Sequence, residues 1–360
     1  MMTSTTHAGP LQRMSETTQT SLWNDSADPT ELATAIGWGA VGATCNPVIA
    51  LAVLKADQAL WAERVRAYVA DHPTATESEV GWAMVRRLST DAAELLRPAF
   101  DAGDGRDGRL SIQVDPRLHK DRDAIVEQAV EFAALAPNMI VKIPATKVGI
   151  EAIEEATFRG VSINATVSFT VPQTIAVAEA VERGLTRREA AGLEISSMGP
   201  VCTIMVGRLD DWLKNVTKRD DIVLDPGMLE WAGVAVFKEA YRIYQERGYR
   251  LRLLSAAFRN HMHWSALIGG DVIISPPFAW GRRLNASDIE PVHSIDAPVP
   301  DGVHEALYFH LPDYRAAFDA DGIPPEGFID FGATRTTLRG FLAACADLET
   351  WVRDIVLPAG

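Results

Sequence analysis

Eight short apolar runs, each followed by a turn signal and a longer helical pattern, constrain the fold of this chain more than any other feature. Such alternation is typical of parallel βα units, in which both faces of the sheet are covered. The runs lie at residues 20–24, 40–44, 110–114, 139–143, 162–167, 201–206, 251–256 and 272–275. Eight such units predict an α/β fold, a closed (β/α)8 TIM barrel.

The competing fold is a doubly wound open sheet. Its dinucleotide-binding form needs the pattern GxGxxG directly after an early strand. The glycines at 103–108 precede a predicted strand instead of following one, so they indicate a plain turn. The barrel is therefore the favoured fold.

Helical patterns fill the segments around the runs. Apolar residues spaced by three and four predict helices at 121–135, 148–157 and 335–356. The long connection 47–100 contains two helical patterns, which predict an inserted helical pair rather than a separate domain. The Pro- and Asp-rich stretch 285–302 is typical of a surface excursion.

Composition bears on location and partners. Residues 1–19 lack the basic-then-apolar order of a signal peptide, so a disordered leader is predicted before a single domain at 20–360. No apolar run approaches the ~20 residues of a membrane helix. A formal net charge of −14 would repel a phosphate backbone or an anionic membrane, which argues against nucleic-acid and membrane partners. The 3 cysteines lie far apart without a CxxC pair, which favours a reducing compartment, the cytoplasm.

Polar residues at the carboxyl ends of barrel strands are the candidates for chemistry, because side chains from different strands converge there. Lys142 is the most informative, since the strand around it, Met-Ile-Val-Lys-Ile-Pro, is otherwise apolar. Burial lowers a lysine pKa and leaves a free amine that can attack a carbonyl and form a Schiff base. The alternative is a lysine that reaches from the strand end to water.

Three other charged residues stand at strand ends. Asp25 suits a helix N-cap as well as a general acid or base. Arg208 and Arg259 each begin the segment after a strand, where a guanidinium and helix N-terminal amides can hold a substrate phosphate. The alternative for each arginine is an ion pair with a surface carboxylate.

No metal site is predicted. His261 and His263 form an HxH pair, but no third ligand has metal-like spacing, and a helix starting there would point the two side chains to different faces. Cys45 has no neighbouring histidine and is interpreted as a packing residue.

Five segments, in this order, resemble the transaldolase family. They are GATCNP at 42–47, IVKIPAT at 140–146, NATVSF at 164–169, MVGR at 205–208 continuing as LDDW, and AFRN at 257–260. The resemblance spans roughly residues 25–276, and 331–356 resembles the family's C-terminal helix. It implies a (β/α)8 barrel and a metal-free class I mechanism without a cofactor.

The resemblance also implies roles for single residues. Lys142 would form the imine with a ketose donor, and Asp25 would take the proton from the hydroxyl whose carbon bond breaks. The remaining roles are hydrogen bonds to donor hydroxyls for Asn46 and Asn164, a water or hydroxyl held near the imine for Thr166 and Thr203, pocket lining for Thr44, and sugar-phosphate binding for Arg208 and Arg259.

Three positions depart from the family pattern. Gln113 stands where transferring members have a proton-shuttling glutamate, and it resembles the fructose 6-phosphate aldolase relatives instead. A carboxamide cannot exchange protons at neutral pH, so proton transfer should fall on Asp25 and water. Met205 matches neither group's aromatic residue, and Ala257 replaces a serine that helps to hold phosphate.

The resemblance therefore predicts a transferase that moves a dihydroxyacetone unit from a ketose phosphate, such as sedoheptulose 7-phosphate or fructose 6-phosphate, to an aldose phosphate. This is carbohydrate metabolism of the pentose phosphate pathway type. One alternative is an aldolase that releases dihydroxyacetone, and another is a non-catalytic barrel that binds sugar phosphates. Family members are often dimers or larger, so a homodimer is an expected assembly.

Overall fold

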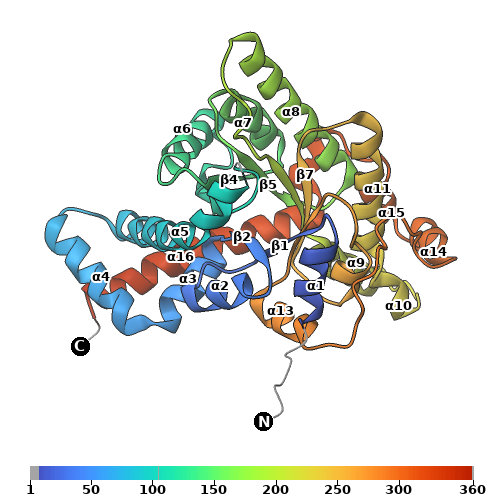
Figure 1. Ribbon diagram of the computed structural model, residues 1–360, viewed down its shortest axis with the longest axis horizontal. Helices are drawn as coiled ribbons and strands as arrows, with labels where there is room; N and C mark the ends of the chain where they lie inside the picture. The colour runs from blue at the N-terminus through green and yellow to red at the C-terminus, as the bar shows by residue number, and fades with distance from the viewer. Residues whose placement is uncertain (1–7, 104, 359–360) are drawn as a thin grey trace.

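The computed structural model describes residues 8–103 and 105–358, and its centre is a closed barrel of eight parallel strands in chain order (Figure 1). The strands are β1 (Ser21–Asn24), β2 (Ala40–Thr44), β3 (Arg109–Gln113), β4 (Met139–Pro144), β5 (Ile163–Ser168), β6 (Val201–Ile204), β7 (Arg252–Ala256) and β8 (Ile273–Ser275). Each overlaps one of the predicted apolar runs, so the TIM barrel is confirmed.

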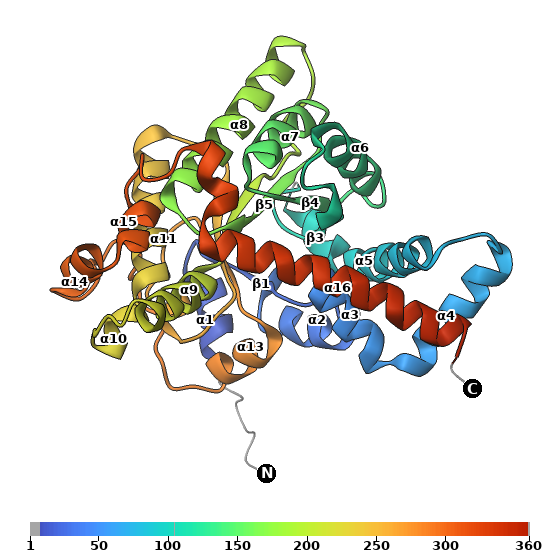
Figure 2. The same ribbon diagram turned by 180° about the vertical axis from the view of Figure 1, so that it is seen from behind.

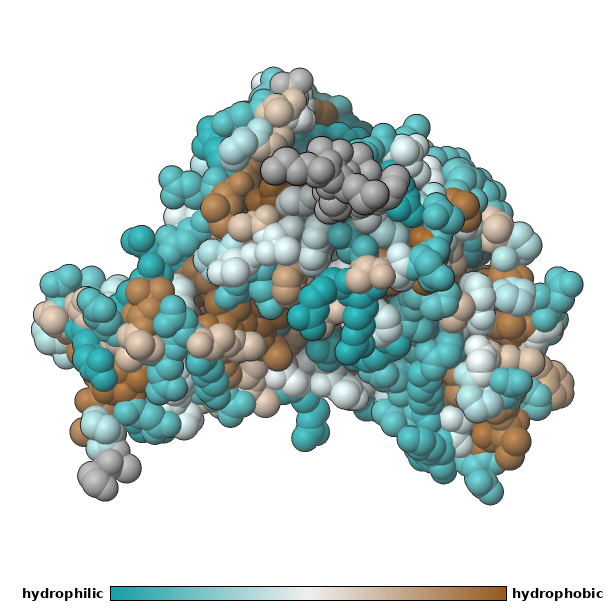
Figure 3. All heavy atoms as spheres, turned by 60° about the horizontal axis from the view of Figure 1, so that its bottom comes forward, coloured by the Kyte–Doolittle hydropathy of each residue, from teal (hydrophilic) through white to brown (hydrophobic). Residues whose placement is uncertain are grey.

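Helices surround the barrel. They are α1 (Pro10–Thr17), α2 (Pro29–Ile36), α3 (Pro47–Ala56), α4 (Gln58–Asp71), α5 (Glu77–Ala102), α6 (Arg122–Ala133), α7 (Lys147–Phe158), α8 (Val171–Ala190), α9 (Val206–Arg219), α10 (Pro226–Leu229), α11 (Ala232–Arg247), α12 (Met262–Ser265), α13 (Phe278–Asn285), α14 (Val303–His310), α15 (Pro312–Phe318) and α16 (Gly332–Val356), with 3₁₀ turns η1 (Pro116–Leu118) and η2 (Pro325–Asp330). Within the described residues, none has the length and apolar character needed to cross a bilayer. Hydrophilic residues cover most of the face in Figure 3, with separate apolar patches between them.

The barrel interior has an apolar layer with polar side chains beyond it. The apolar cluster consists of Trp23, Ile140, Val201, Leu254, Ala256 and Ile273. Side chains alternate along a strand, so Lys142 shares the inward face of β4 with Ile140 and lies nearer the carboxyl end. Its register partners are Gln113 on β3 and Asn164 on β5. The register therefore brings three of the predicted site residues together.

The N-terminal segment differs from the prediction. Residues 10–17, expected within a disordered leader at 1–19, form α1, while residues 1–7 lie outside the described part of the chain. Leu11 and Met14 of α1 are fully buried, and the Trp264 indole N–H lies 3.0 Å from Met14 Sδ. Pro10 suits the first helical turn, and burial of two large apolar side chains outweighs the low helix propensity of this polar segment.

The insertion after β2 contains three helices rather than the predicted pair. The additional break falls at Asp57, which ends α3 and whose side chain accepts a hydrogen bond from the backbone N–H of Leu60 at the start of α4. A short acidic side chain can cap a helix in this way, so α3 and α4 are separate helices where the sequence analysis predicted one. The second break precedes α5, where Thr76 and Glu79 form a capping box.

The last helix crosses the barrel. α16 contacts α3, α5, α9 and β5, and Figure 2 shows it running across the molecule in front of the strands. Its first residue, Gly332, packs against the indole of Trp212, and a Cβ at this position would lie 1.9 Å from the ring. The predicted C-terminal helix is confirmed, and it starts a few residues earlier than expected, at this close approach.

Candidate active site

Lys142 projects from the centre of β4 into the carboxyl end of the barrel. Its side chain is 4% exposed, and burial lowers its pKa. The nearby Asp25 and Cys45 oppose this shift, whereas the positive charge of Arg208 adds to it. A lowered pKa increases the fraction of neutral amine at physiological pH, which is the form that attacks a carbonyl carbon.

Asp25 is held at the end of β1 by its neighbours. Its carboxylate accepts a hydrogen bond from Thr44 on β2, and its backbone N–H donates to the Pro276 carbonyl over 3.1 Å. Thr44 Oγ1 also lies 3.5 Å from Ser275 Oγ on β8. Asp25 is therefore not a helix N-cap: Asp28 caps α2 instead. The carboxylate is close enough to the Lys142 amine to raise the pKa of the lysine against the effect of burial.

Three hydroxyl and amide side chains line the adjacent wall. Thr203 donates to Asn164 Oδ1 over 2.7 Å, and Asn164 Nδ2 donates to Ser111 Oγ over 3.0 Å. All three side chains are at most 1% exposed. Ser111 was absent from the sequence prediction, although its position two residues before Gln113, on the same face of β3, could have indicated it.

Gln113 is the unsatisfied member of the group. Its side chain is 2% exposed, and neither Nε2 nor Oε1 has a hydrogen-bond partner among the described residues. Buried carboxamides are normally paired, so these two atoms are available to a bound hydroxyl or water. Thr166 lies on the neighbouring wall, with Oγ1 4.0 Å from Met205 Sδ.

Asn46 and Cys45 follow β2. Asn46 Oδ1 accepts from the backbone N–H groups of Val48 and Ile49, both over 3.0 Å, so it caps α3, and only its amide nitrogen remains for a donor hydroxyl. Cys45 is buried, and burial raises its pKa to about 12. A protonated thiol fits the packing role predicted for it.

Arg259 is paired with the carboxylate of Asp211, and Arg208 lies nearby. The Arg259 Nε and Nη2 atoms lie 2.9 and 2.8 Å from Asp211 Oδ2, and Nη1 donates to the carbonyls of Ala257 and Phe258. Burial lowers the pKa of Arg208. The positive charge of the nearby Arg259 lowers this pKa further, whereas the carboxylate of Asp211 opposes the shift. The two guanidinium groups therefore form one positive region, in which Arg259 holds the ion pair with a surface carboxylate that the sequence left open as its alternative.

The helix α16 completes the surroundings of Arg208. Arg208 Nη1 donates to Thr337 Oγ1 over 3.4 Å, and the guanidinium carbon lies 5.8 Å from the centre of the Phe341 ring. Arg208 Nε is buried without a partner among the described residues. A small cavity of about 60 Å³ lies here, between α9 and the start of α16. Arg208 is one of the residues that line this cavity.

Backbone strain flanks the site on two strands. Val167, directly after Thr166, has φ 53°, and Ala257, directly after β7, has φ 63°. Non-glycine residues in the left-handed region cost about 1 kcal/mol or more and persist where their surroundings hold them. Gln173 holds the first position, because its Nε2 donates to the Val167 and Ala145 carbonyls, each over 3.0 Å.

The histidine pair is divided, as the sequence predicted. His261 is exposed, with Nδ1 3.0 Å from Ser265 Oγ, whereas His263 is fully buried, with Nε2 2.8 Å from Asp210 Oδ2. Burial raises the pKa of Asp210, and its hydrogen bond with His263 opposes the shift. This buried acid–base pair had no sequence signal, because its members are far apart in the chain.

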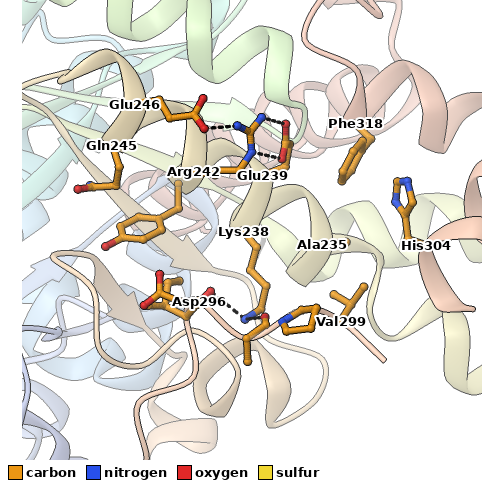
Figure 4. Close-up of a pocket in the computed structure, with 14 residues that line it drawn as sticks. Ala235, Lys238, Glu239, Arg242, Gln245, Glu246, Asp296, Val299, His304 and Phe318 are labelled. Carbon is orange, nitrogen blue, oxygen red and sulfur yellow. Dashed lines mark hydrogen bonds and ion pairs between the residues drawn. The ribbon is translucent and has the colours of Figure 1, made fainter. Parts of the chain in front are cut away.

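A larger cavity lies away from this chemistry. It measures about 490 Å³ between α11, the segment at 295–299 and α14–α15. In Figure 4, Arg242 is paired with Glu239 and Glu246, and Lys238 is bonded to the segment beside it. The Lys238 ammonium donates to the carbonyls of Ser294, Ile295 and Ala297, so its role is to hold the loop. The barrel mouth remains the candidate active site.

Comparison with known proteins identifies relatives of the chain. "Transaldolase 2" of Streptomyces avermitilis is 36% identical over 215 residues, which cover 57% of this chain and 55% of that relative. "Transaldolase 1" of Streptomyces coelicolor is 33% identical over 273 residues, covering 71% of this chain and 69% of the relative. The match to "Transaldolase" of Mycobacterium ulcerans covers 46% of each chain. Several of these matches thus span about half of the relative's length. A family model described as Transaldolase/Fructose-6-phosphate aldolase matches residues 22–292, and the chain accordingly belongs to this family.

Proposed function

We propose that this protein is a transaldolase-type transferase that works through a Schiff base on Lys142. The observation that carries the proposal is the buried Lys142 amine beside the Asp25 carboxylate, ringed by amide and hydroxyl side chains. Ketose phosphates are the proposed donors and aldose phosphates the proposed acceptors.

The proposed reaction begins with attack of the Lys142 amine on the donor's ketone carbon and loss of water, which leaves a protonated imine. Asp25 takes the proton of the hydroxyl on the carbon two bonds from the imine carbon. The bond between this carbon and the carbon next to the imine breaks, the hydroxyl carbon becomes the aldehyde carbonyl of the leaving aldose, and the electron pair of the bond moves into the imine to form an enamine. An aldose leaves, a second aldose enters, and the enamine attacks its carbonyl carbon while Asp25 returns the proton. Hydrolysis of the new imine restores the amine and frees the ketose.

The polar wall supports this chemistry by holding the three-carbon fragment. Asn164 and Thr203 are fixed by their mutual hydrogen bond, so they need no reorganisation when the donor's hydroxyls arrive. Thr166 and the unpaired Gln113 carboxamide are the proposed partners of a water or hydroxyl near the imine.

Gln113 also supports the second candidate, an aldolase that releases dihydroxyacetone. Gln113 resembles the residue of the fructose 6-phosphate aldolase relatives rather than the glutamate of the transferring members. The test is product analysis with fructose 6-phosphate alone and then with erythrose 4-phosphate added. We expect slow or no release of dihydroxyacetone with the donor alone and formation of sedoheptulose 7-phosphate when the acceptor is present. Steady release of dihydroxyacetone at a rate that the acceptor does not change would identify the aldolase.

The positive region at Arg208 and Arg259 is the proposed phosphate site. Arg259→Ala is expected to raise KM for fructose 6-phosphate about tenfold or more, because a charge-assisted contact to phosphate is lost. For unphosphorylated fructose, KM should change little. Steady-state kinetics on both sugars makes the comparison, and equal effects on the two would remove Arg259 from this role.

The three cysteines Cys45, Cys202 and Cys345 are buried free thiols, which supports a reducing location, and we propose the cytoplasm. A homodimer is the proposed assembly, and sedimentation analysis would test it.

A further inference from the structure

A buried acid–base pair lies behind the proposed phosphate site. Asp210 on α9 and His263 on α12 are each 0% exposed, and they are bonded to each other over 2.8 Å. Neither touches the polar wall around Lys142. Burying a carboxylate costs free energy unless the group is paired and hydrogen-bonded. The hydrogen bonds of Asp210 therefore indicate what the residue does.

The pattern fixes the histidine's hydrogen. The backbone N–H of Arg259 donates to His263 Nδ1 over 3.1 Å, and a backbone N–H can only donate. Nδ1 is therefore the acceptor nitrogen, and the ring hydrogen sits on Nε2, facing Asp210. The other carboxylate oxygen of Asp210 accepts from the backbone N–H of Gly233 over 2.8 Å. The pair thus joins α9, α11 and the turn after β7.

The pair joins α9 to the turn after β7, and these two elements carry the arginines of the proposed phosphate site. Arg208 and Asp211 are on α9, and Arg259 is in the turn after β7. The turn contains the strained Ala257, and a Cβ on Gly207 would lie 2.1 Å from the Ala257 carbonyl oxygen. Hydrogen bonds that hold such a turn against a neighbouring helix determine where its side chains point.

We infer that Asp210 and His263 are positioning residues of the phosphate site, which set the spacing of Arg208 and Arg259 and thereby the preference for phosphorylated sugars. The kinetic test of this inference rests on the proposed function, whereas the phosphate-binding measurement described below is independent of it. The pair acts on the two arginines through the backbone N–H of Arg259 and through α9.

Asp210→Asn tests the inference with almost no change of shape. An amide in this position must present an N–H either to the Gly233 N–H or to His263 Nε2. In the second case the ring hydrogen moves to Nδ1 and faces the Arg259 N–H. Either arrangement sets one donor against another, so the hold on Arg259 or on α11 is lost. We expect KM for fructose 6-phosphate to rise about tenfold while kcat and the KM for fructose change less than about threefold.

His263 offers a matched pair of variants. In His263→Asn the side-chain oxygen can replace Nδ1 and accept from Arg259, whereas in His263→Gln the longer amide can replace Nε2 and reach Asp210. We expect the Asn variant to keep most of the phosphate preference and the Gln variant to lose it. If both variants lower thermal stability and leave the ratio of the two KM values unchanged, the pair is only structural and the inference is wrong.

Asp296→Asn is the control, because Asp296 forms the same kind of bond, 2.6 Å from His293 Nε2, on an exposed segment. It should change neither KM. Calorimetric titration with inorganic phosphate gives a readout that needs no turnover: affinity should fall about tenfold in Asp210→Asn and Arg259→Ala, and remain in Asp296→Asn. Phosphate binding without any ketose adduct on Lys142 would reject the proposed function alone. Equal phosphate affinity in the wild type, Asp210→Asn and His263→Gln would reject the positioning role.

Discussion

Replacing Lys142 with methionine is expected to reduce turnover of any ketose donor by at least about 10⁴-fold, because the variant lacks the amine that forms the imine. Borohydride treatment in the presence of fructose 6-phosphate should label Lys142 of the wild type and leave the variant unlabelled. Peptide mass analysis locates the adduct.

Phosphate binding provides the control for this variant. Lys142→Met should retain the wild-type affinity for inorganic phosphate, because Arg208 and Arg259 are unchanged. Turnover at the wild-type rate would contradict the Schiff base. If a panel of ketoses leaves even the wild-type protein unlabelled while phosphate still binds, the alternative of a non-catalytic sugar-phosphate barrel is favoured instead.

The same substitution should make the protein more stable at neutral pH. Burial lowers the pKa of Lys142 below its ordinary value of 10.5. Between the two pKa values the unfolded chain binds one proton more than the folded chain, so the stability of the wild type rises with pH in that interval. Methionine removes this term. The variant's advantage should therefore shrink as the pH approaches 10.5, which denaturant unfolding at several pH values measures.

Asp25→Asn is expected to lower kcat by about 10²–10⁴-fold, the usual contribution of a general acid or base. Asparagine can still accept the hydrogen bond from Thr44, so the local structure should be retained, but it cannot take the hydroxyl proton when the carbon–carbon bond breaks. Imine formation should persist. The expected signature is a borohydride adduct on Lys142 with almost no product.

Thr44→Val separates the proton transfer from the orientation of the carboxylate. It removes the hydroxyl that donates to Asp25 and should reduce kcat by a smaller factor than Asp25→Asn. A wild-type kcat in Asp25→Asn would transfer the proton step to water or another group. Loss of both the adduct and turnover would mean that Asp25 is needed before the bond breaks.

The barrel could be predicted because each strand is covered on both faces and therefore stands out as a short apolar run. Lys142 could be found for the same reason: a charged residue inside such a run has few physical explanations. Its neighbours Gln113 and Asn164 then follow from register. The helix α1 was missed because its stability comes from two apolar side chains in a polar segment, which local composition does not reveal.

The parts of the site that could not be predicted depend on contacts between distant segments. Nothing in the sequence distinguishes Asp211 from the other acidic residues on helices, because its ion pair with Arg259 depends on the fold. The bond between Asp210 and His263 spans a separation along the chain that no pattern encodes. Thr337 and Phe341 reach Arg208 only because α16 crosses the mouth. Asp57 could have been recognised as a cap, which would have given three helices after β2.

The position of α16 in chain order has a consequence for biosynthesis. All eight strands precede α16, so a nascent chain emerging N-terminus first can close the barrel before Gly332–Val356 has been translated. In that interval Arg208 lacks Thr337 and Phe341, and the small cavity between α9 and α16 does not exist. Folding of the barrel and completion of the proposed phosphate site are therefore separate events, and the second waits for α16 to leave the ribosome and dock.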